Sequence, residues 1–222
     1  DHIDDNVPVR HVLASVSDKR GLDIFIPGLV KLIPDVKIFS TGGTFTAIQQ
    51  ILGAKAAKNL EQVSAYTGQP EMQGGLVKTL DFKIYLGLLS ETYNVAHKDD
   101  LRRVNAVAID MVVVNLYPFQ QTVAKPDVTP EMARTNIDIG GPCMVRASAK
   151  NFLRVASVTD PNAYDAILKE LAGNKGRLSL RTRLALARRA FDHTARYDTA
   201  IAAYLASRTD DAVAACYKIE SK

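Results

Sequence analysis

Two loops combine hydroxyl groups, glycines and a lysine in a pattern that suits a phosphate group. Residues 15–21 hold Ser17, Asp18 and Lys19, and residues 40–44 read Ser-Thr-Gly-Gly-Thr. Each loop precedes a predicted helix, whose first backbone N–H groups and positive dipole end favour an anion. The same residue types also form ordinary turns and helix caps, so one loop alone leaves both interpretations open. Two such loops at one edge of a sheet favour an anion site.

Two further polar residues stand beside apolar residues at loops that could face a ligand. Tyr117 comes directly after an apolar run that ends in Asn115, and Asp138 lies between two isoleucines before a glycine pair. A carboxylate in apolar surroundings needs a partner, and a tyrosine at the end of a strand can offer its hydroxyl to a ligand. The plain alternatives are a packing tyrosine and an aspartate that caps the following helix.

Two lysines are candidates for the same chemistry. Lys78, with Thr79 beside it, follows a diglycine turn, and on its own this signal is weak because most such lysines are solvated. Lys150 ends a predicted helix whose other residues are mostly apolar or small. Snorkelling of the long side chain is the common explanation for such a lysine, and a catalytic role is the alternative.

Short apolar runs alternate with amphipathic stretches in the first half of the chain. Strands are predicted at residues 11–16, 36–40, 84–89 and 111–116, and helices at 22–33, 44–52 and 101–108. Strands that alternate with helices form a parallel sheet with both faces covered. We therefore expect an α/β protein with a three-layer, doubly wound parallel sheet, whose ligands bind outside the carboxyl ends of the strands.

The second half of the chain is mainly helical. Helices are predicted at residues 130–135, 142–151 and 161–171, a strand at 155–158, and one long amphipathic helix from residue 180 onward. No linker rich in Pro, Gly or Ser separates the halves. We expect a single domain over residues 1–222, with an α/β core at about 12–125 and a mainly helical part at about 126–207.

Composition excludes several classes of protein. Of the 222 residues, 47% are hydrophobic and 23% charged, which suits a globular chain with a real core. The net charge is only +4 and the apolar runs are short, so neither nucleic-acid binding nor a membrane span is expected. The densest basic group is predicted to be a solvated helix face and comprises Arg181, Arg183, Arg188 and Arg189.

Cysteine and histidine usage gives no sign of a metal or of a disulfide framework. The two cysteines, Cys143 and Cys216, are far apart in the sequence, and the four histidines lack ligand spacing. A cytoplasmic location is the default expectation for such a chain.

Seven short motifs, taken in order, carry a resemblance to a known family. The chain is similar to the IMP cyclohydrolase domain of the bifunctional enzyme that also carries AICAR formyltransferase. The motifs are Ser15-x-Ser17-Asp18-Lys19-x-Gly21-Leu22, Thr41-Gly42-Gly43-Thr44, Pro70-Glu71-Met72-x-Gly74-Gly75, Val77-Lys78-Thr79-Leu80, Asn115-Leu116-Tyr117-Pro118-Phe119, Ile137-Asp138-Ile139-Gly140-Gly141 and Arg146-Ala147-x-Ala149-Lys150-Asn151. A later stretch, Ala190-Phe191-x-His193-Thr194-Ala195-x-Tyr197-Asp198, matches too.

The resemblance implies a fold, a reaction and partners. The fold is a methylglyoxal-synthase-like α/β core with a helical C-terminal extension. The reaction is ring closure of the formamido ribonucleotide FAICAR to IMP and water, the last step of de novo purine biosynthesis, and it needs no cofactor. A separate formyl-transferring enzyme would supply FAICAR, and a homodimer is possible. Either a stand-alone cyclohydrolase or the corresponding part of a longer enzyme fits the resemblance.

The resemblance also implies roles for individual residues. The expected catalytic residues are Lys78, Tyr117, Asp138 and Lys150. The expected nucleotide-binding residues are Ser17, Asp18, Lys19, Thr41, Gly42, Gly43, Thr44, Val77, Thr79, Asn115 and Ile139. The chain departs from the family at Leu76, where an arginine is usual, and at Asp81-Phe82, where His-Pro is usual. These departures bear on the phosphate contacts, for which Lys19 and Lys78 are the remaining obvious cations.

Two other functions remain open at this stage. A methylglyoxal synthase would use the same two phosphate loops, but it would not call for residues 137–151 or the long C-terminal helix. A non-catalytic module that senses a phosphorylated effector would bind a nucleotide without turnover.

Overall fold

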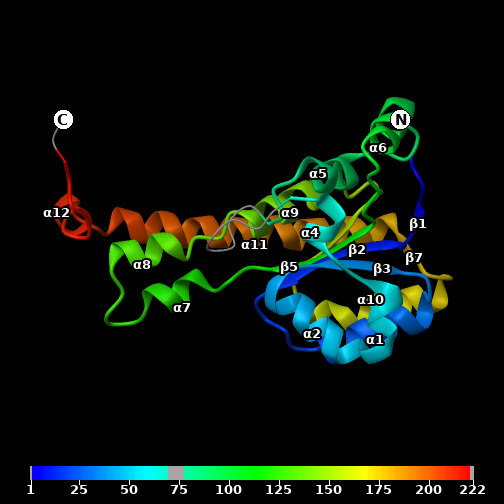
Figure 1. The fold of residues 1–222 in the computed structure, drawn as a ribbon, viewed down its shortest axis with the longest axis horizontal. Coiled ribbons are helices and arrows are strands. Elements are labelled where there is room, and N and C mark those ends of the chain that lie inside the picture. Colours follow the sequence, from blue (N-terminus) through cyan, green and yellow to red (C-terminus); the bar gives the residue numbers. More distant parts are fainter. Residues whose placement is uncertain (1, 70–77, 221–222) are drawn as a thin grey trace.

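A five-stranded parallel sheet forms the centre of the protein in the computed structural model, which describes residues 2–69 and 78–220 (Figure 1). Its strand order is β4-β3-β2-β5-β6, and every neighbouring pair is parallel. The strands are β2 (His11–Val16), β3 (Lys37–Ser40), β4 (Leu60–Gln62), β5 (Met111–Asn115) and β6 (Ala156–Val158). The predicted three-layer, doubly wound α/β fold is thereby confirmed.

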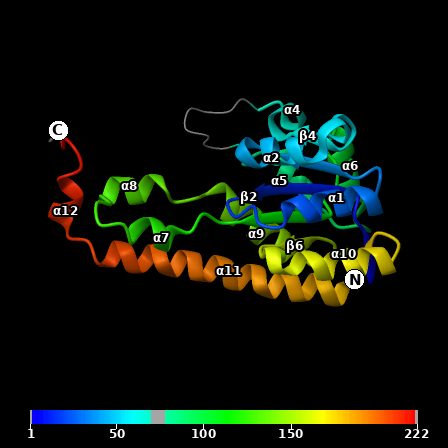
Figure 2. The same ribbon diagram turned by 90° about the horizontal axis from the view of Figure 1, so that it is seen from below.

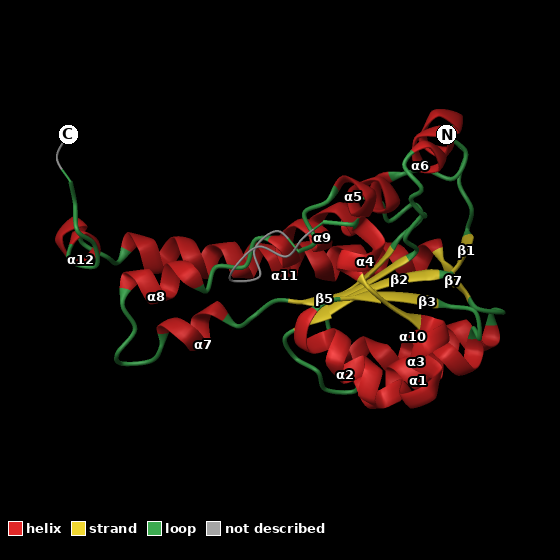
Figure 3. Ribbon diagram, in the orientation of Figure 1, coloured by secondary structure: helices red, strands yellow, loops and turns green. Residues whose placement is uncertain are grey.

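Both faces of the sheet are covered by helices, as Figure 3 shows. Along β2, Val12 and Ala14 face one hydrophobic cluster, and Leu13 between them faces the other. Alternation of side chains across a pleated strand explains why a sheet covered twice has nearly continuous apolar strands. One layer contains α1 (Leu22–Leu32), α2 (Gly42–Leu52) and α10 (Tyr164–Gly173); the other contains α5 (Phe82–Leu89), α9 (Gly140–Lys150) and α11 (Leu180–Ala206).

Residues 84–89, predicted as a strand, form helix α5 instead. Asp81 caps this helix by accepting a hydrogen bond from the Lys83 backbone N–H at 2.8 Å. Ile84 and Leu88, one turn apart, are fully buried against the sheet. Periodicity cannot distinguish a strand from a buried helix in so short an apolar run. The helix-capping residue Asp81 just before the run was the sequence signal that favoured a helix.

Helix α11 is the longest element and reaches well beyond the sheet. Its 27 residues correspond to roughly 40 Å of helix. Figure 2 shows that its outer half extends away from the sheet beside α7 (Phe119–Val123), that α8 (Pro130–Thr135) lies farther from it on the other side of α7, and that α12 (Asp210–Ala214) follows it. The long helix predicted from residue 180 onward is confirmed. It therefore runs past both the core and the segments that follow β5.

Arg183 was predicted to lie on a solvated helix face, but it is buried. Its side chain is 1% exposed, and its guanidinium donates hydrogen bonds to the backbone carbonyls of residues 4, 5, 152, 153 and 178. Burial lowers the pKa of this guanidinium from its usual range. A planar group with five donors can join three separate segments in this way, whereas Arg181 and Arg188 on the same helix are exposed.

The remaining described elements are short and connect the layers. Strand β6, although it follows residue 126, belongs to the central sheet. The helix predicted at residues 101–108 lies earlier, because Asn94 caps it through the His97 backbone N–H. No helix among the described residues has the length and apolar character that a membrane span requires. The other elements are the antiparallel pair β1 (Asn6–Pro8) and β7 (Arg177–Ser179), helices α3 (Ala56–Asn59), α4 (Val63–Thr67) and α6 (Val95–Arg103), and two 3₁₀ turns at Gly53–Lys55 and Pro161–Ala163.

Candidate functional site

A cleft of about 510 Å³ opens at the carboxyl edge of the sheet. The loops after β2, β3 and β5 line it, together with the segment that leads into α9. Ligands of open parallel sheets bind at this edge, where strand order reverses. Twelve of the predicted site residues meet here, namely Ser17, Lys19, Thr41, Gly42, Gly43, Thr44, Lys78, Thr79, Asn115, Tyr117, Asp138 and Ile139.

The N-terminus of α2 and two lysines face one end of the cleft. A Cβ atom placed on Gly42 would lie 3.7 Å from Lys78 Nζ, and one on Gly43 would lie 3.9 Å from Lys19 Nζ. Gly42 also has a φ of +56°, which disfavours any residue with a side chain. The first turn of α2 thus offers backbone N–H groups between two ammonium groups. That combination suits a phosphate or another compact anion.

Hydrogen bonds to Val16 fasten the two loops of this anion site to each other. The Thr44 hydroxyl accepts from the Val16 backbone N–H at 3.0 Å and donates to the Val16 carbonyl at 3.2 Å. Lys19 Nζ donates to the same carbonyl at 3.3 Å. The hydroxyl of Thr44, predicted to bind nucleotide, is therefore engaged in joining α2 to the end of β2.

Asn115 likewise holds the loop after β2. Its side-chain oxygen accepts from the Asp18 backbone N–H at 2.8 Å, and its side-chain nitrogen donates to the Asp18 carbonyl at 2.9 Å. The Asp18 carboxylate pairs with Arg20 at 2.6 Å, which lowers the pKa of Asp18. It lines a neighbouring cleft, so the structure does not bring this predicted residue to the cleft that holds Lys19.

Asp138 also lines the cleft, two residues before the first residue of α9. Its Oδ1 accepts a hydrogen bond from the Gly141 N–H at 3.0 Å. A Cβ atom on Gly141 would come within 2.3 Å of Asp138 Oδ2, so only glycine leaves room for the carboxylate. The Asp138 backbone N–H donates to the Tyr197 hydroxyl at 2.7 Å. The helix start thus holds the carboxylate of Asp138, and α11 holds its backbone.

Tyr117 and Thr79 complete the described polar lining. Tyr117, two residues after the end of β5, is 47% exposed and lines the cleft. Thr79 is buried, and its Oγ1 would lie 2.7 Å from a Cβ on Gly140. The Thr79 side chain therefore lies close to the Gly140 backbone, where the segment carrying Lys78 meets the start of α9. Val77, predicted to bind nucleotide, and Leu76, which departs from the family pattern, lie outside the described residues.

Lys150 does not lie in the cleft, contrary to the expectation that it joins Asp138 there. It is the last residue of α9, is exposed, and is absent from the lining of the cleft. The first residue of the helix, Gly140, lines the cleft, and Lys150 is ten positions further along the helix, a distance of roughly 15 Å. The helix that positions Asp138 thus carries Lys150 away from it.

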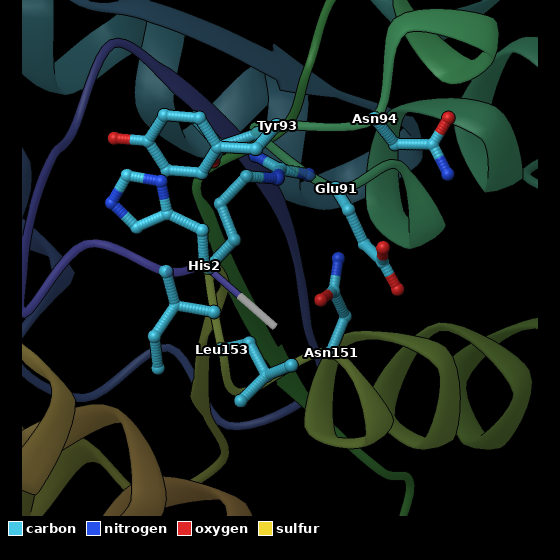
Figure 4. A pocket seen from close by; sticks show the side chains of 9 residues that line it. His2, Glu91, Tyr93, Asn94, Asn151 and Leu153 are labelled. Atoms are coloured by element: carbon cyan, nitrogen blue, oxygen red, sulfur yellow. The ribbon is translucent and has the colours of Figure 1, made fainter.

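A second cavity, of about 560 Å³, lies near the opposite edge of the sheet (Figure 4). His2 stacks on Tyr93 with ring centroids 4.1 Å apart at its border, and Asn151 and Arg154 line it as well. The Arg154 guanidinium is engaged by three carbonyls and by Asp110. None of the predicted site residues lines this cavity.

Residues that the sequence reasoning did not assign also contribute to the main cleft. Ser15, Thr135 and Asn136 line it; Ser15 opens the first matched motif, whereas no spacing or motif singles out Thr135 and Asn136 from ordinary loop residues. His193 and Tyr197 on α11 contact the segments that carry Tyr117 and Asp138. The signal in the sequence that could have indicated these two residues is their spacing of four, one helical turn, within the last matched motif. Across residues 2–69 and 78–220, no group of three or more His, Cys, Asp or Glu side chains is arranged to hold a metal ion.

Comparisons with known proteins agree with this architecture. The model of the MGS-like domain family matches residues 24–143, and the model of the AICARFT/IMPCHase bienzyme family matches residues 148–222. A solved structure titled as that of ForH superposes with a TM-score of 0.71 at 32% identity, covering 88% of this chain and 97% of that chain. The protein class defined by fold and cleft is thus a doubly wound α/β domain of the MGS-like type.

The curated relatives are longer proteins with one shared name. The bifunctional purine biosynthesis protein PurH of Chlorobium phaeobacteroides strain DSM 266 is 48% identical over 204 residues, and that of Neisseria meningitidis serogroup A is 47% identical over 203. These matches cover 92% and 91% of this chain, but only 38% and 37% of the relatives. The chain belongs to the MGS-like domain family and matches the part of the AICARFT/IMPCHase bienzymes that contains this domain.

Proposed function

We propose that this chain is an IMP cyclohydrolase, which closes the pyrimidine ring of FAICAR to give IMP and water. The single observation that carries the proposal is one cleft that is lined both by a phosphate-type anion site and by an anchored carboxylate, Asp138. The names of the family and of the relatives supply the chemical class. Because the chain spans about 37% of those relatives, the proposal concerns this part only.

The anionic end of the nucleotide is proposed to sit on α2. The backbone N–H groups of Gly42 and Gly43 and the ammonium groups of Lys19 and Lys78 supply positive charge and donors from three segments. Fixing the phosphate there leaves the base to extend along the cleft toward Tyr117 and Asp138. A substrate held at both ends adopts few rotamers, which is the main requirement of an intramolecular ring closure.

The ring closure itself needs proton transfers and charge stabilisation. The carboxamide nitrogen of FAICAR attacks the formyl carbon, a C–N bond forms, and the formyl oxygen becomes an oxyanion. Asp138 accepts the proton that the attacking nitrogen loses, and Tyr117 donates to the oxyanion, while Lys78 stays with the phosphate. The former formyl oxygen then leaves as water after the formamido nitrogen has lost its proton. No oxidant, metal or cofactor enters this balance.

The partners follow from this chemistry. A formyl-transferring activity must supply FAICAR, either on another protein or elsewhere in a longer one. A homodimer and a cytoplasmic location remain part of the same proposal. Lys150 has no role in the proposed mechanism, because the helix that carries it leads away from the cleft.

A paired turnover assay tests the proposed function. The protein is incubated with FAICAR, and IMP is quantified by chromatography; a parallel sample receives dihydroxyacetone phosphate and is assayed for methylglyoxal. We expect IMP in the first sample and no enzymatic methylglyoxal in the second. Methylglyoxal formation would instead identify a lyase, and tight nucleotide binding without either product would identify an effector-binding module.

A further inference from the structure

We infer that His193 and Tyr197, one turn apart on α11, are positioning residues that hold Tyr117 and Asp138 in the cleft through two backbone hydrogen bonds. The inference rests on the proposed function, since it assigns a second layer of residues to the same site. Neither side chain lines the main cleft. Both act on the segments that do.

The two contacts lie on one stripe of α11. His193 Nε2 accepts the backbone N–H of Leu116 at 3.2 Å, and the Tyr197 hydroxyl accepts the backbone N–H of Asp138 at 2.7 Å. Residues four apart share a helix face, so one rigid helix fixes both segments at once. Tyr117 directly follows Leu116 in the chain. The stripe therefore sets the relative positions of the two proposed catalytic groups.

Phe119 adds an apolar contact to the same stripe. Its ring meets the Tyr197 ring edge to face at a centroid distance of 6.3 Å, and it meets the Tyr204 ring in the same way at 5.8 Å. Phe119 is 1% exposed. Packing of Phe119 against two tyrosines thus holds the segment after β5 on α11, and the hydrogen bonds of His193 and Tyr197 fix the orientation of the backbone that they contact.

The protonation states fit acceptor roles for both side chains. A backbone N–H can only donate, so His193 Nε2 must carry its lone pair, and the ring must be neutral with its proton on Nδ1. Burial lowers the pKa of His193, which favours this neutral form. Burial likewise raises the pKa of Tyr197 and keeps the phenol protonated.

Charged side chains that share the pocket of His193 come from several elements. Asp18 and Arg20 follow β2, Asp160 follows β6, and Arg189, Asp192 and Arg196 lie on α11. Asp160 and Asp192 favour the protonated ring and Arg196 opposes it, but desolvation is the largest influence. The neutral imidazole is thus the result of burial within a mixed-charge pocket.

Tyr204 provides a matched control for Tyr197. Both tyrosines lie on α11, both are 7% exposed, and both pack edge-on against Phe119. The Tyr204 hydroxyl has no hydrogen-bond partner in the described part of the chain. Tyr197→Phe therefore removes the hydrogen bond to Asp138, whereas Tyr204→Phe changes the same group in similar surroundings without removing any.

The test compares the wild type, Tyr197→Phe, Tyr204→Phe and His193→Leu in FAICAR turnover, IMP binding and amide hydrogen exchange. For Tyr197→Phe we expect about a tenfold lower kcat, a KM within about twofold of the wild type, and faster exchange at the Asp138 amide. His193→Leu is expected to lower kcat similarly and to speed exchange at the Leu116 amide. Tyr204→Phe is expected to match the wild type in all three measurements.

The outcomes separate the inference from the proposed function. Equal kcat in Tyr197→Phe and Tyr204→Phe, with an active wild type, overturns the inference and leaves the function intact. A wild type that binds IMP but forms none overturns the proposed function, and the exchange rates at Asp138 and Leu116 then still test the two contacts. Equal losses of kcat and thermal stability in both Phe variants would mean a purely structural role and would also overturn the inference.

Discussion

Replacing Gly141 with alanine should displace the proposed catalytic carboxylate while leaving the fold intact. The added Cβ would lie 2.3 Å from Asp138 Oδ2 and 2.8 Å from Leu116 Cδ2, both shorter than any normal contact. Gly141 is a buried residue in the first turn of α9, where its N–H holds Asp138 Oδ1 at 3.0 Å. The carboxylate must therefore move by about 1 Å or rotate away from the helix start.

The expected magnitudes follow from this displacement. A misplacement of about 1 Å at a reacting group costs roughly a hundredfold in rate. The free energy of unfolding should change much less, because the gain of about 1 kcal/mol from replacing glycine in a helix offsets a strain of about 1–3 kcal/mol. The variant is therefore expected to lose about 100-fold in kcat and at most about 2 kcal/mol in stability.

Steady-state turnover of FAICAR and urea unfolding measure these two quantities. Gly173→Ala is the matched control, because Gly173 ends helix α10 and a Cβ there meets no atom within 4 Å. We expect the control to keep wild-type kcat and to gain about 0.4–1 kcal/mol in stability. Wild-type kcat in Gly141→Ala would refute the reasoning that Asp138, held as the structure shows, performs the proton transfer.

Three further predictions concern charge and burial. Lys19→Ala should raise the KM for FAICAR by about tenfold or more with a smaller change in kcat, because it removes an ammonium group from the phosphate end; equal losses in both parameters would contradict that location. Arg183→Met should lower the free energy of unfolding by about 4 kcal/mol, since several buried carbonyls lose their donors. The same change at the exposed Arg188 should alter the free energy of unfolding by less than about 0.5 kcal/mol. Similar urea midpoints for the two variants would contradict a structural role for the buried Arg183 guanidinium. Burial lowers the pKa of His193 in the folded chain. Below a pH of about 6.5 the unfolded chain therefore binds a proton at His193 more readily than the folded chain does, so the free energy of unfolding should decrease as the pH decreases. Urea unfolding at pH 7.5 and 5.5 should therefore show a larger loss of stability for the wild type than for His193→Leu, and equal losses would speak against a half-buried, neutral His193.

The sheet and its ligand-binding edge were predictable because their signals are local. Apolar runs mark β2, β3 and β5, and the polar, glycine-containing loops that follow two of these strands form the anion end of the cleft. Helix α5 was not predictable from periodicity, because its eight residues are too few to show it. Strand β4 has only three residues, and its place depends on pairing with β3.

Which residues fill the site was predictable only in part. Thr44 and Asn115 have the residue types of ligand-binding groups, but their polar atoms are engaged with the backbone of Val16 and Asp18. Whether a polar side chain bonds a ligand or the backbone depends on the tertiary structure and cannot be told from the residue type. Lys150 is a different case, because the rise of the predicted helix already carries it away from the residues before that helix.

The most direct test of the central claim is a crystal structure of the protein with bound IMP. We expect the phosphate on the N-terminus of α2 between Lys19 and Lys78, and the base within hydrogen-bond reach of Asp138 and Tyr117. IMP bound elsewhere, for example in the cavity beside His2 and Arg154, or bound with its base away from Asp138, would contradict the account.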